Sequence, residues 1–284
     1  MLQVINRARA GGQLGRDSGR ERPRLSELKI GIRLASLKLG VRKGLAVAKQ
    51  LGARSVEIDA RGEIRPEALT QSGLRELRRL IEEHGLGVSA VGFATRRGYD
   101  VADDLERRVA ATEAAMKLAA DLRACVVVNQ VGRVPAESSG PGWDQLVQSL
   151  GDLSHYGQHV GAILAAQTGT ESGADLARLL AALPPQGIGV DLDPGNLIIN
   201  GFSAIEAVAA LGPSIVHVHA RDGVRDLARG RGLEVPLSRG VADFPALLGA
   251  LEEHRYRGYF TIARDDAADA ISEIGDAVQY LKSL

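Results

Sequence analysis

Eight short runs of mainly apolar, often β-branched residues recur through the chain, and longer segments separate them. The runs are residues 29–34, 54–58, 86–92, 124–129, 161–167, 187–191, 214–219 and 258–263. A parallel pair of strands needs a crossover of a dozen or more residues, which is usually a helix. The alternation therefore predicts an α/β chain built on a parallel sheet.

The separating segments have the spacing of helices that bury one face. An example is the set Leu74, Leu77, Leu80 and Ile81. Several runs follow a glycine that suits a left-handed helix C-cap, namely Gly52, Gly85, Gly161 and Gly212. Eight such units have the size of a closed (β/α)8 TIM barrel, and no G-x-G-x-x-G sequence follows the first run. We predict a single barrel domain over residues 25–284.

Composition excludes some classes of partner. The chain has 284 residues, 35 Lys and Arg against 35 Asp and Glu, and 45% hydrophobic residues, which can form one large core. With balanced charge, we expect neither a nucleic-acid nor a membrane partner. The single cysteine, Cys125, excludes an internal disulfide and lies in an apolar run, so we expect it in the core of a cytoplasmic protein.

Residues 1–24 differ from the rest of the chain. They carry six arginines among Gly, Ser and Gln, with almost no apolar residue after Ile5. From this composition we predict a flexible, disordered Arg-rich tail. The segment lacks the apolar stretch of a secretory signal. A solvated leader, a start codon assigned too far upstream, and a role in binding nucleic acid or membrane are the alternatives.

Three segments near the ends of predicted strands carry a family resemblance. They read IGVDLDPGNL at 188–197, IVHVHARD at 215–222 and GYFTIAR at 258–264. In this order they resemble the signatures of the xylose-isomerase-like TIM barrel superfamily, which contains the sugar phosphate isomerase/epimerase family. The likeness covers essentially residues 28–284.

The resemblance implies a divalent metal (Mn, Mg, Co or Zn) bound by Glu, Asp, His and Glu from strands five to eight. That ion and the carboxylates would move a proton next to a sugar carbonyl. This chain keeps Asp193 and His219 as metal ligands, but Gln167 and Ala263 stand at the two glutamate positions, and Asn196 replaces a histidine. An amide is not a general base, so the resemblance implies a degraded metal site in which Gln167 and Asn196 contact substrate instead.

Other polar residues near the strand ends are weaker candidates. Glu171 and Asp222 are catalytic candidates, although a solvated acid at a helix start is the favoured interpretation of Glu171. Asp191 shares strand parity with Asp193, and His217 with His219, so both should point into the barrel. We expect His217 either to bond the barrel wall or to contact substrate.

Arginines mark the segment after the seventh run. It carries Arg221, Arg225, Arg229, Arg231 and Arg239 among several glycines. Guanidinium groups match carboxylate and phosphate geometry, so we predict that Arg221 and Arg239 bind an acidic or phosphorylated sugar under a closing lid. A solvated loop is the alternative.

Two main functions follow from these residues. The first is an isomerase or epimerase of a small sugar-like or acidic sugar ligand, working with a rearranged metal site. The second is a non-catalytic barrel that binds a ligand or a partner protein. An abasic-site nuclease on the same fold is disfavoured, because its multi-zinc cluster is rich in histidine and glutamate, and only His217 and His219 of the six histidines lie at a strand end. The substrate and the oligomeric state stay open.

Overall fold

The computed structural model describes residues 28–62, 64–185, 187–225 and 232–284. The predicted tail over residues 1–24 lies outside the described residues, and so do Arg229 and Arg231.

Eight parallel strands form a closed barrel in the order β1-β10-β7-β6-β5-β4-β3-β2. The strands are β1 (Lys29–Arg33), β2 (Ser55–Asp59), β3 (Gly87–Gly92), β4 (Val126–Asn129), β5 (Ile163–Gln167), β6 (Gly189–Leu192), β7 (Ile215–Ala220) and β10 (Tyr259–Ile262). Each lies within two residues of a predicted run. The predicted (β/α)8 TIM barrel is confirmed.

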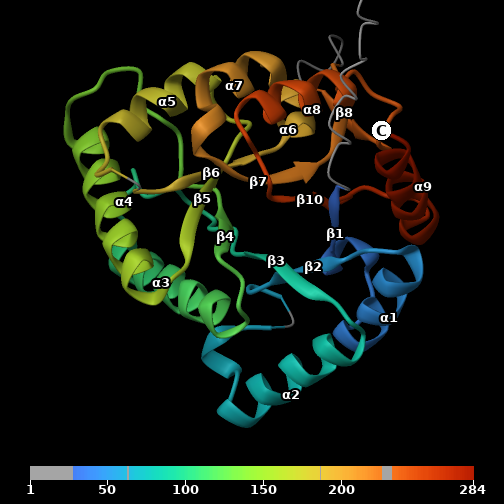
Figure 1. The fold of residues 1–284 in the computed structure, drawn as a ribbon. Coiled ribbons are helices and arrows are strands. Elements are labelled where there is room, and N and C mark those ends of the chain that lie inside the picture. Colours follow the sequence, from blue (N-terminus) through green and yellow to red (C-terminus); the bar gives the residue numbers. More distant parts are fainter. Residues whose placement is uncertain (1–27, 63, 186, 226–231) are drawn as a thin grey trace, which may run out of the picture.

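Helices surround the barrel in the order of the chain, so that the last helix lies beside the first (Figure 1). They are α1 (Val41–Leu51), α2 (Gln71–Glu83), α3 (Leu105–Asp121), α4 (Pro141–Val160), α5 (Gly173–Ala181), α6 (Pro194–Ile199), α7 (Ala204–Leu211), α8 (Phe244–Glu253) and α9 (Ala270–Ser283). Short 3-10 turns cover Leu34–Leu37, Pro66–Ala68 and Gly212–Ser214.

Glycine ends three of these helices as predicted. Gly52 and Gly161 are left-handed C-caps with φ of 88° and 82°, and Gly85 follows the C-cap of α2 with φ of 63°. Gly212 was predicted to do the same, but its φ is −32°, because it begins a 3-10 turn that Pro213 continues.

The barrel closes where β1 pairs with β10. Ile30 pairs with Phe260 and Ile32 with Ile262, and all four side chains are buried. The core lies between the barrel and the helices, where buried side chains such as Leu45, Leu146 and Leu176 pack. Hydrophobic burial on this scale is the main stabilising term for the fold.

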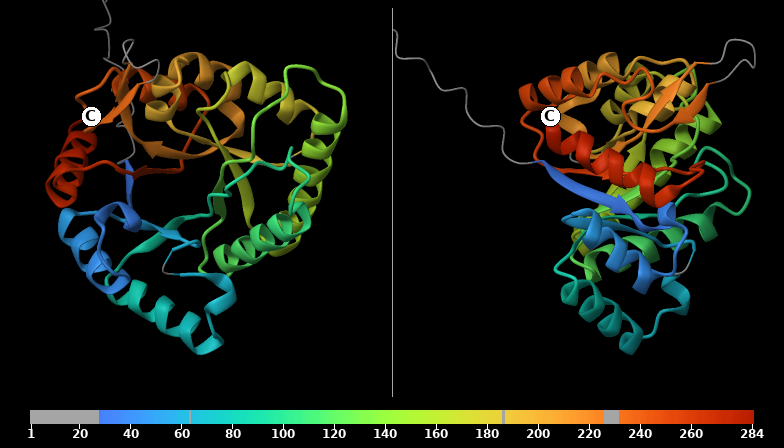
Figure 2. Two further views of the ribbon diagram at one scale, coloured as in Figure 1. Left: turned by 180° about the vertical axis from the view of Figure 1, so that it is seen from behind. Right: turned by 90° about the vertical axis from the view of Figure 1, so that its right-hand side faces the viewer.

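The segment after β7 contains an antiparallel hairpin. Its strands are β8 (Asp222–Val224) and β9 (Leu233–Val235). In the right-hand view of Figure 2, the hairpin stands at the end of the barrel toward which β1 runs. The described part of this segment is therefore regular structure, and the closing lid stays a prediction.

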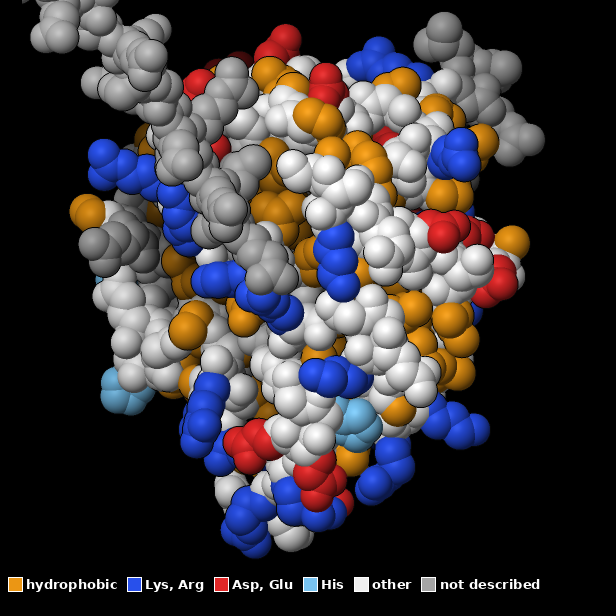
Figure 3. Space-filling model, turned by 45° about the vertical axis from the view of Figure 1, so that its right-hand side comes forward, with side chains coloured by type: hydrophobic (Ala, Val, Ile, Leu, Met, Phe, Trp, Pro, Cys, Tyr) orange, Lys and Arg blue, Asp and Glu red, His pale blue; other side chains and the backbone are white. Residues whose placement is uncertain are grey.

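Cys125 is exposed, which corrects its expected place in the core. It lies one residue before β4, and its neighbours Ala124 and Val126 take the buried positions. Positive and negative side chains are interspersed on the face shown in Figure 3. Within the described ranges, no helix has both the length and the apolar character that a bilayer crossing requires.

Candidate functional site

A cavity of about 210 Å³ lies at the carboxyl ends of the barrel strands. Polar side chains dominate its lining, which consists of Arg33, Glu57, Asp59, Arg61, Gly92, Phe93, Ala94, Val128, Asn129, Gln130, Gln167, His219, Arg221, Ala263 and Asp265. These residues come from at least six strands or from the loops that follow them. This is the end of a TIM barrel where active sites are found.

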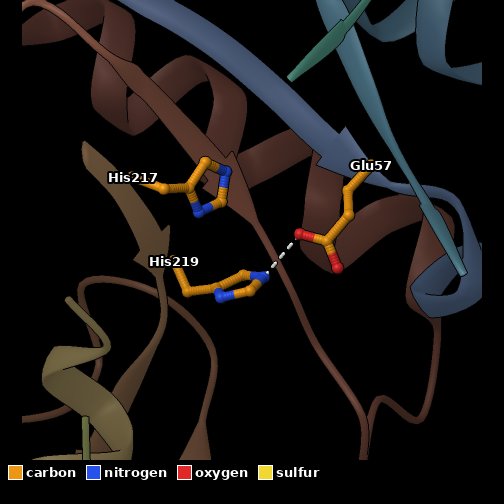
Figure 4. Close-up of side chains that lie close together, drawn as sticks. All are labelled: Glu57, His217 and His219. Carbon is orange, nitrogen blue, oxygen red and sulfur yellow. Dashed lines mark hydrogen bonds and ion pairs between the residues drawn. The ribbon is translucent and has the colours of Figure 1, made fainter. Parts of the chain in front are cut away.

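His219 joins two buried carboxylates, those of Asp191 and Glu57, and Figure 4 shows its contact with Glu57. Its Nδ1 lies 2.6 Å from Asp191 Oδ2, and its Nε2 lies 2.7 Å from Glu57 Oε2. All three side chains are at least 96% buried. Because a carboxylate only accepts hydrogen bonds, this arrangement requires a proton on both ring nitrogens.

The charges in this chain of contacts stabilise one another. Burial lowers the pKa of His219, but Asp191 and Glu57 outweigh it and hold that pKa well above the ordinary value. Burial raises the pKa of Glu57, and the net direction is down because His219 and Arg33 favour its ionised form. Burial also raises the pKa of Asp191, but His219 and His217 outweigh it, and the net direction is down. The stable form is an imidazolium between two carboxylates.

His217 lies one layer deeper in the barrel. Its Nδ1 is 2.8 Å from Asp191 Oδ1, and its Nε2 is 2.8 Å from Thr261 Oγ1. Thr261 Oγ1 in turn lies 3.0 Å from Ser89 Oγ. The prediction that Asp191 and His217 point into the barrel is confirmed, and His217 bonds the barrel wall. Asp191 aligns both histidines.

Asp193 directly follows β6 and caps α6. Its Oδ1 accepts from Asn196 N at 2.8 Å, and its Oδ2 accepts from Gln167 Nε2 at 3.0 Å and Arg221 Nη1 at 3.3 Å. Burial raises the pKa of Asp193, and the Arg221 guanidinium acts in the opposite direction. The aspartate at the family's metal position thus carries an ion pair within the chain.

Arg221 contacts three carboxylates at once. Besides Asp193, it donates through Nε to Glu234 Oε1 and through Nη2 to Asp265 Oδ2, both at 3.0 Å. Burial disfavours the cation, but the carboxylates raise the pKa of Arg221 overall. Its planar fork suits this role, because each nitrogen edge faces a different acid.

Two further arginines extend the network to β1 and α9. Arg33 donates to Asp265 Oδ1 at 2.6 Å, and its Nε lies 3.5 Å from Glu57 Oε1. Arg264 bonds Glu234 at 2.8 Å and Glu273 at 2.7 Å. Negatively charged carboxylates and positively charged guanidinium groups therefore alternate around the cavity.

The predicted site residues divide into two groups. Gln167, His219 and Arg221 line the cavity, and Asp193 and His217 are buried beside them. The other four lie outside the cavity lining. Asn196 donates from Nδ2 to Thr168 O, Asp222 accepts from three backbone N–H groups, Arg239 is exposed, and Glu171 bonds Thr170.

Glu171 was expected as a solvated acid, and that expectation is wrong. The residue is only 7% exposed, and burial raises the pKa of its carboxyl group. It precedes the N-cap Ser172 of α5, where the loop turns it inward.

Glu57 is the residue of this site that sequence reasoning missed. It stands between Val56 and Ile58 in a buried strand. An acid inside such a run is rarely buried without a partner, so its position was the available signal.

The resemblance places the family's two glutamate ligands at Gln167 and Ala263, and its aspartate ligand at Asp193. Gln167 and Ala263 supply no charge there, and Asp193 is paired with Arg221. Glu57, His217 and His219 do offer ligand atoms within 4.8 Å of one another. However, His219 Nε2 is hydrogen-bonded to Glu57, and both nitrogens of His217 also have partners. An ion among these three would have to displace those bonds.

The closed parallel barrel makes this protein a (β/α)8 TIM barrel protein. Buried acidic side chains, histidines and arginines form a network at the carboxyl ends of its strands. The chain belongs to the xylose isomerase-like TIM barrel family, whose model matches residues 45–284. This confirms the resemblance drawn from the three sequence segments.

Solved structures share this fold. A xylose isomerase domain protein from Planctomyces limnophilus is 24% identical, with a TM-score of 0.80 over 91% of this chain and 97% of that one. A xylose isomerase-like TIM barrel protein from Mycobacterium smegmatis, in complex with magnesium, is 17% identical, with a TM-score of 0.72 over 90% and 95%. D-allulose 3-epimerase from Methylomonas sp., in complex with D-allulose, is 17% identical, with a TM-score of 0.71 over 90% and 97%. No curated protein sequence matches.

Proposed function

We propose that this protein is an isomerase of a small sugar-like ligand, which binds in the cavity and exchanges a proton next to its carbonyl group. The observation that carries the proposal is the carboxylate of Glu57, which lines the cavity and is held by His219 and Arg33. We also propose that the metal site of the family is degraded in this chain, and no step of this reaction depends on it.

In this proposal, Glu57 is the group that removes the proton. Its lowered pKa keeps it ionised near neutral pH, as a proton acceptor must be. His219 and Asp191 fix its orientation from below. A single carboxylate can take a proton from one carbon and return it to the neighbouring carbon. The geometry therefore suits isomerisation better than epimerisation by two bases.

The negative charge that forms on the substrate oxygen also needs a partner. Arg33 and Arg221 line the same cavity as Glu57 and supply fixed positive charge there. Such preorganised charge stabilises an enediolate without solvent reorganisation.

The lining favours a polyhydroxylated ligand. Asn129, Gln130 and Gln167 offer amide groups for sugar hydroxyls. Arg61 also lines the cavity and lies over the Phe93 ring at 5.5 Å, which favours a ligand with a carboxylate or phosphate. D-allulose, the sugar in the complex of the Methylomonas enzyme, is a natural first probe.

The test is proton exchange in D₂O. Full-length protein is incubated with ketohexoses, including D-allulose, and with hexuronates, and deuterium at the carbon next to the carbonyl is followed by NMR. We expect exchange with the natural chain and a loss of roughly 100-fold or more in Glu57→Gln. Glu76→Gln on the exposed face of α2 is the control and should exchange normally.

The alternative is a non-catalytic barrel that binds such a ligand. The observation that favours it is the pairing of Arg221 and Asp265 with each other and with neighbouring charges, which leaves few groups free to act on a substrate. Ligand-induced thermal stabilisation without deuterium exchange would support this alternative and contradict the isomerase.

A further inference from the structure

We infer that the Arg221 guanidinium is the resident cation of this barrel, and that it excludes a divalent metal ion from Asp193. The inference concerns the charge at the site and is independent of whether the barrel is catalytic. It explains, from contacts within the chain, why two of the family's ligand positions lack a carboxylate.

The carboxylates around Arg221 already have a cation among them. The Arg221 guanidinium lies within 3.3 Å of carboxylate oxygens from Asp193, Glu234 and Asp265. Three carboxylates around one position would suit a divalent ion, but here the guanidinium of Arg221 is the cation that they surround. The guanidinium side chain is only 15% exposed, so solvent weakens these ion pairs little.

The backbone is also shaped to hold the arginine there. Gly195, in the first turn of α6, lies so close to Arg221 that an added Cβ would come within 2.9 Å of the Arg221 Cβ and carbonyl carbon. The absence of a side chain at Gly195 lets the start of α6 approach residue 221. This close approach brings Asp193, which caps α6, within reach of the guanidinium.

The substituted ligand positions also suit an arginine. Gln167 donates to the same oxygen of Asp193 that Arg221 contacts. A glutamate in its place would face Asp193 at that distance as a like charge, and would need a metal between them. An amide donor instead completes the arrangement around an arginine. Ala263, also in the lining, leaves room beside it.

A metal ion at Asp193 would therefore have to displace the guanidinium. Glu234 would keep Arg264, and Asp265 would keep Arg33, but both would lose the charge at the centre of the cluster. With Arg221 retained, the ion would face a fixed positive charge at close range.

The experiment compares Mn²⁺ binding by four full-length proteins, using calorimetric titration and elemental analysis. They are the natural chain, Gln167→Glu with Ala263→Glu, that pair with Arg221→Met, and that pair with Arg264→Met. Arg264 is the matched control, because it is also buried and bonds Glu234, but no contact joins it to Asp193.

We expect no stoichiometric metal in the natural chain, and weak binding in the glutamate pair. Adding Arg221→Met should tighten Mn²⁺ binding by at least about tenfold, and adding Arg264→Met should not. Equal affinity of the glutamate pair with and without Arg221 would overturn the inference. So would tight, one-to-one binding by the natural chain.

If the triple variant does not fold, the natural chain alone still tests the inference. Its unfolding temperature should stay the same after treatment with EDTA and in millimolar Mn²⁺. A rise with Mn²⁺ that Asp193→Asn abolishes would contradict the inference. Deuterium exchange that persists in EDTA would support both this inference and the isomerase proposal, whereas metal-free protein without exchange would contradict only the isomerase.

Discussion

Glu171 is a buried acid that accepts a hydrogen bond from Thr170 and lies outside the cavity lining. Burial raises the pKa of its carboxyl group above the ordinary value of 4.5. The folded protein therefore binds this proton more strongly than the unfolded chain does. Its contribution to the free energy of unfolding must fall as pH rises through the unfolded pKa toward the folded pKa.

We predict that Glu171→Gln changes the free energy of unfolding more favourably at pH 7 than at pH 4. The reason is that the amide removes the charge that the buried carboxyl group acquires as pH rises. Urea unfolding at the two pH values measures this. Glu273→Gln provides a control of opposite sign: burial raises its pKa, but Arg264 and backbone N–H groups lower it overall, so the carboxylate stabilises at pH 7. A Glu171 variant that loses stability on going from pH 4 to pH 7, relative to the natural chain, would refute the account.

Residue types and strand parity were enough to predict part of the site. Asp193, His217 and His219 were found from the family segments, and the inward direction of Asp191 from its parity. The contacts of Arg221 could not be predicted, since Glu234 and Asp265 lie 13 and 44 residues further along the chain, beyond the range of a local pattern. Glu57 was missed because its partner His219 is 162 residues away.

At the scale of elements, the β8–β9 hairpin depends on one buried side chain. Asp222 accepts hydrogen bonds from Gly223 N at 2.8 Å, Gly240 N at 2.9 Å and Ala242 N at 3.0 Å. An added Cβ at Gly240 would come within 2.1 Å of Asp222 Oδ1, so only glycine fits this approach. Asp222 thus ties the start of β8 to the segment that leads into α8.

We predict that Asp222→Ala destabilises the protein by about 2–4 kcal/mol, since several buried N–H groups lose a charged acceptor. Hydrogen exchange should increase first at residues 222–225 and 232–242. Asp243→Ala is the control: it removes the N-cap of α8 and should cost about 1 kcal/mol, without affecting β8. Unchanged exchange of the hairpin in Asp222→Ala would contradict the anchoring role.

The main strands were predictable because their apolar runs repeat at regular spacing. The hairpin was not, because each of its strands has three residues, and Asp-Gly-Val and Leu-Glu-Val carry no period. Its pairing rests on Asp222, a long-range contact that no local pattern reveals.

The interior of the whole barrel narrows around Gly31. This residue pairs with Ser55 on one side and Thr261 on the other. An added Cβ would lie 2.8 Å from Ser55 Oγ and 2.9 Å from Thr261 Oγ1. Thr261 Oγ1 also lies 2.8 Å from His217 Nε2, so a larger side chain at position 31 would displace Thr261 and disturb the hydrogen bonds of the histidines.

We predict that Gly31→Val destabilises the protein by roughly 1–3 kcal/mol through overpacking. Chemical denaturation measures the loss. The control is Gly249→Ala in the interior of α8, where an added Cβ meets nothing within 4 Å. That change should stabilise by about 0.5–1 kcal/mol. If Gly31→Val were as stable as the natural chain, the barrel would have to be less tightly filled than described.

The ion pair between Arg33 and Asp265 joins the first strand to the loop that follows the last one. Both side chains also line the cavity. During synthesis the lining of this cavity therefore stays incomplete until the end of the chain is made, since 232 residues separate the two partners. A nascent chain on the ribosome should complete the cavity only after its final strand has emerged.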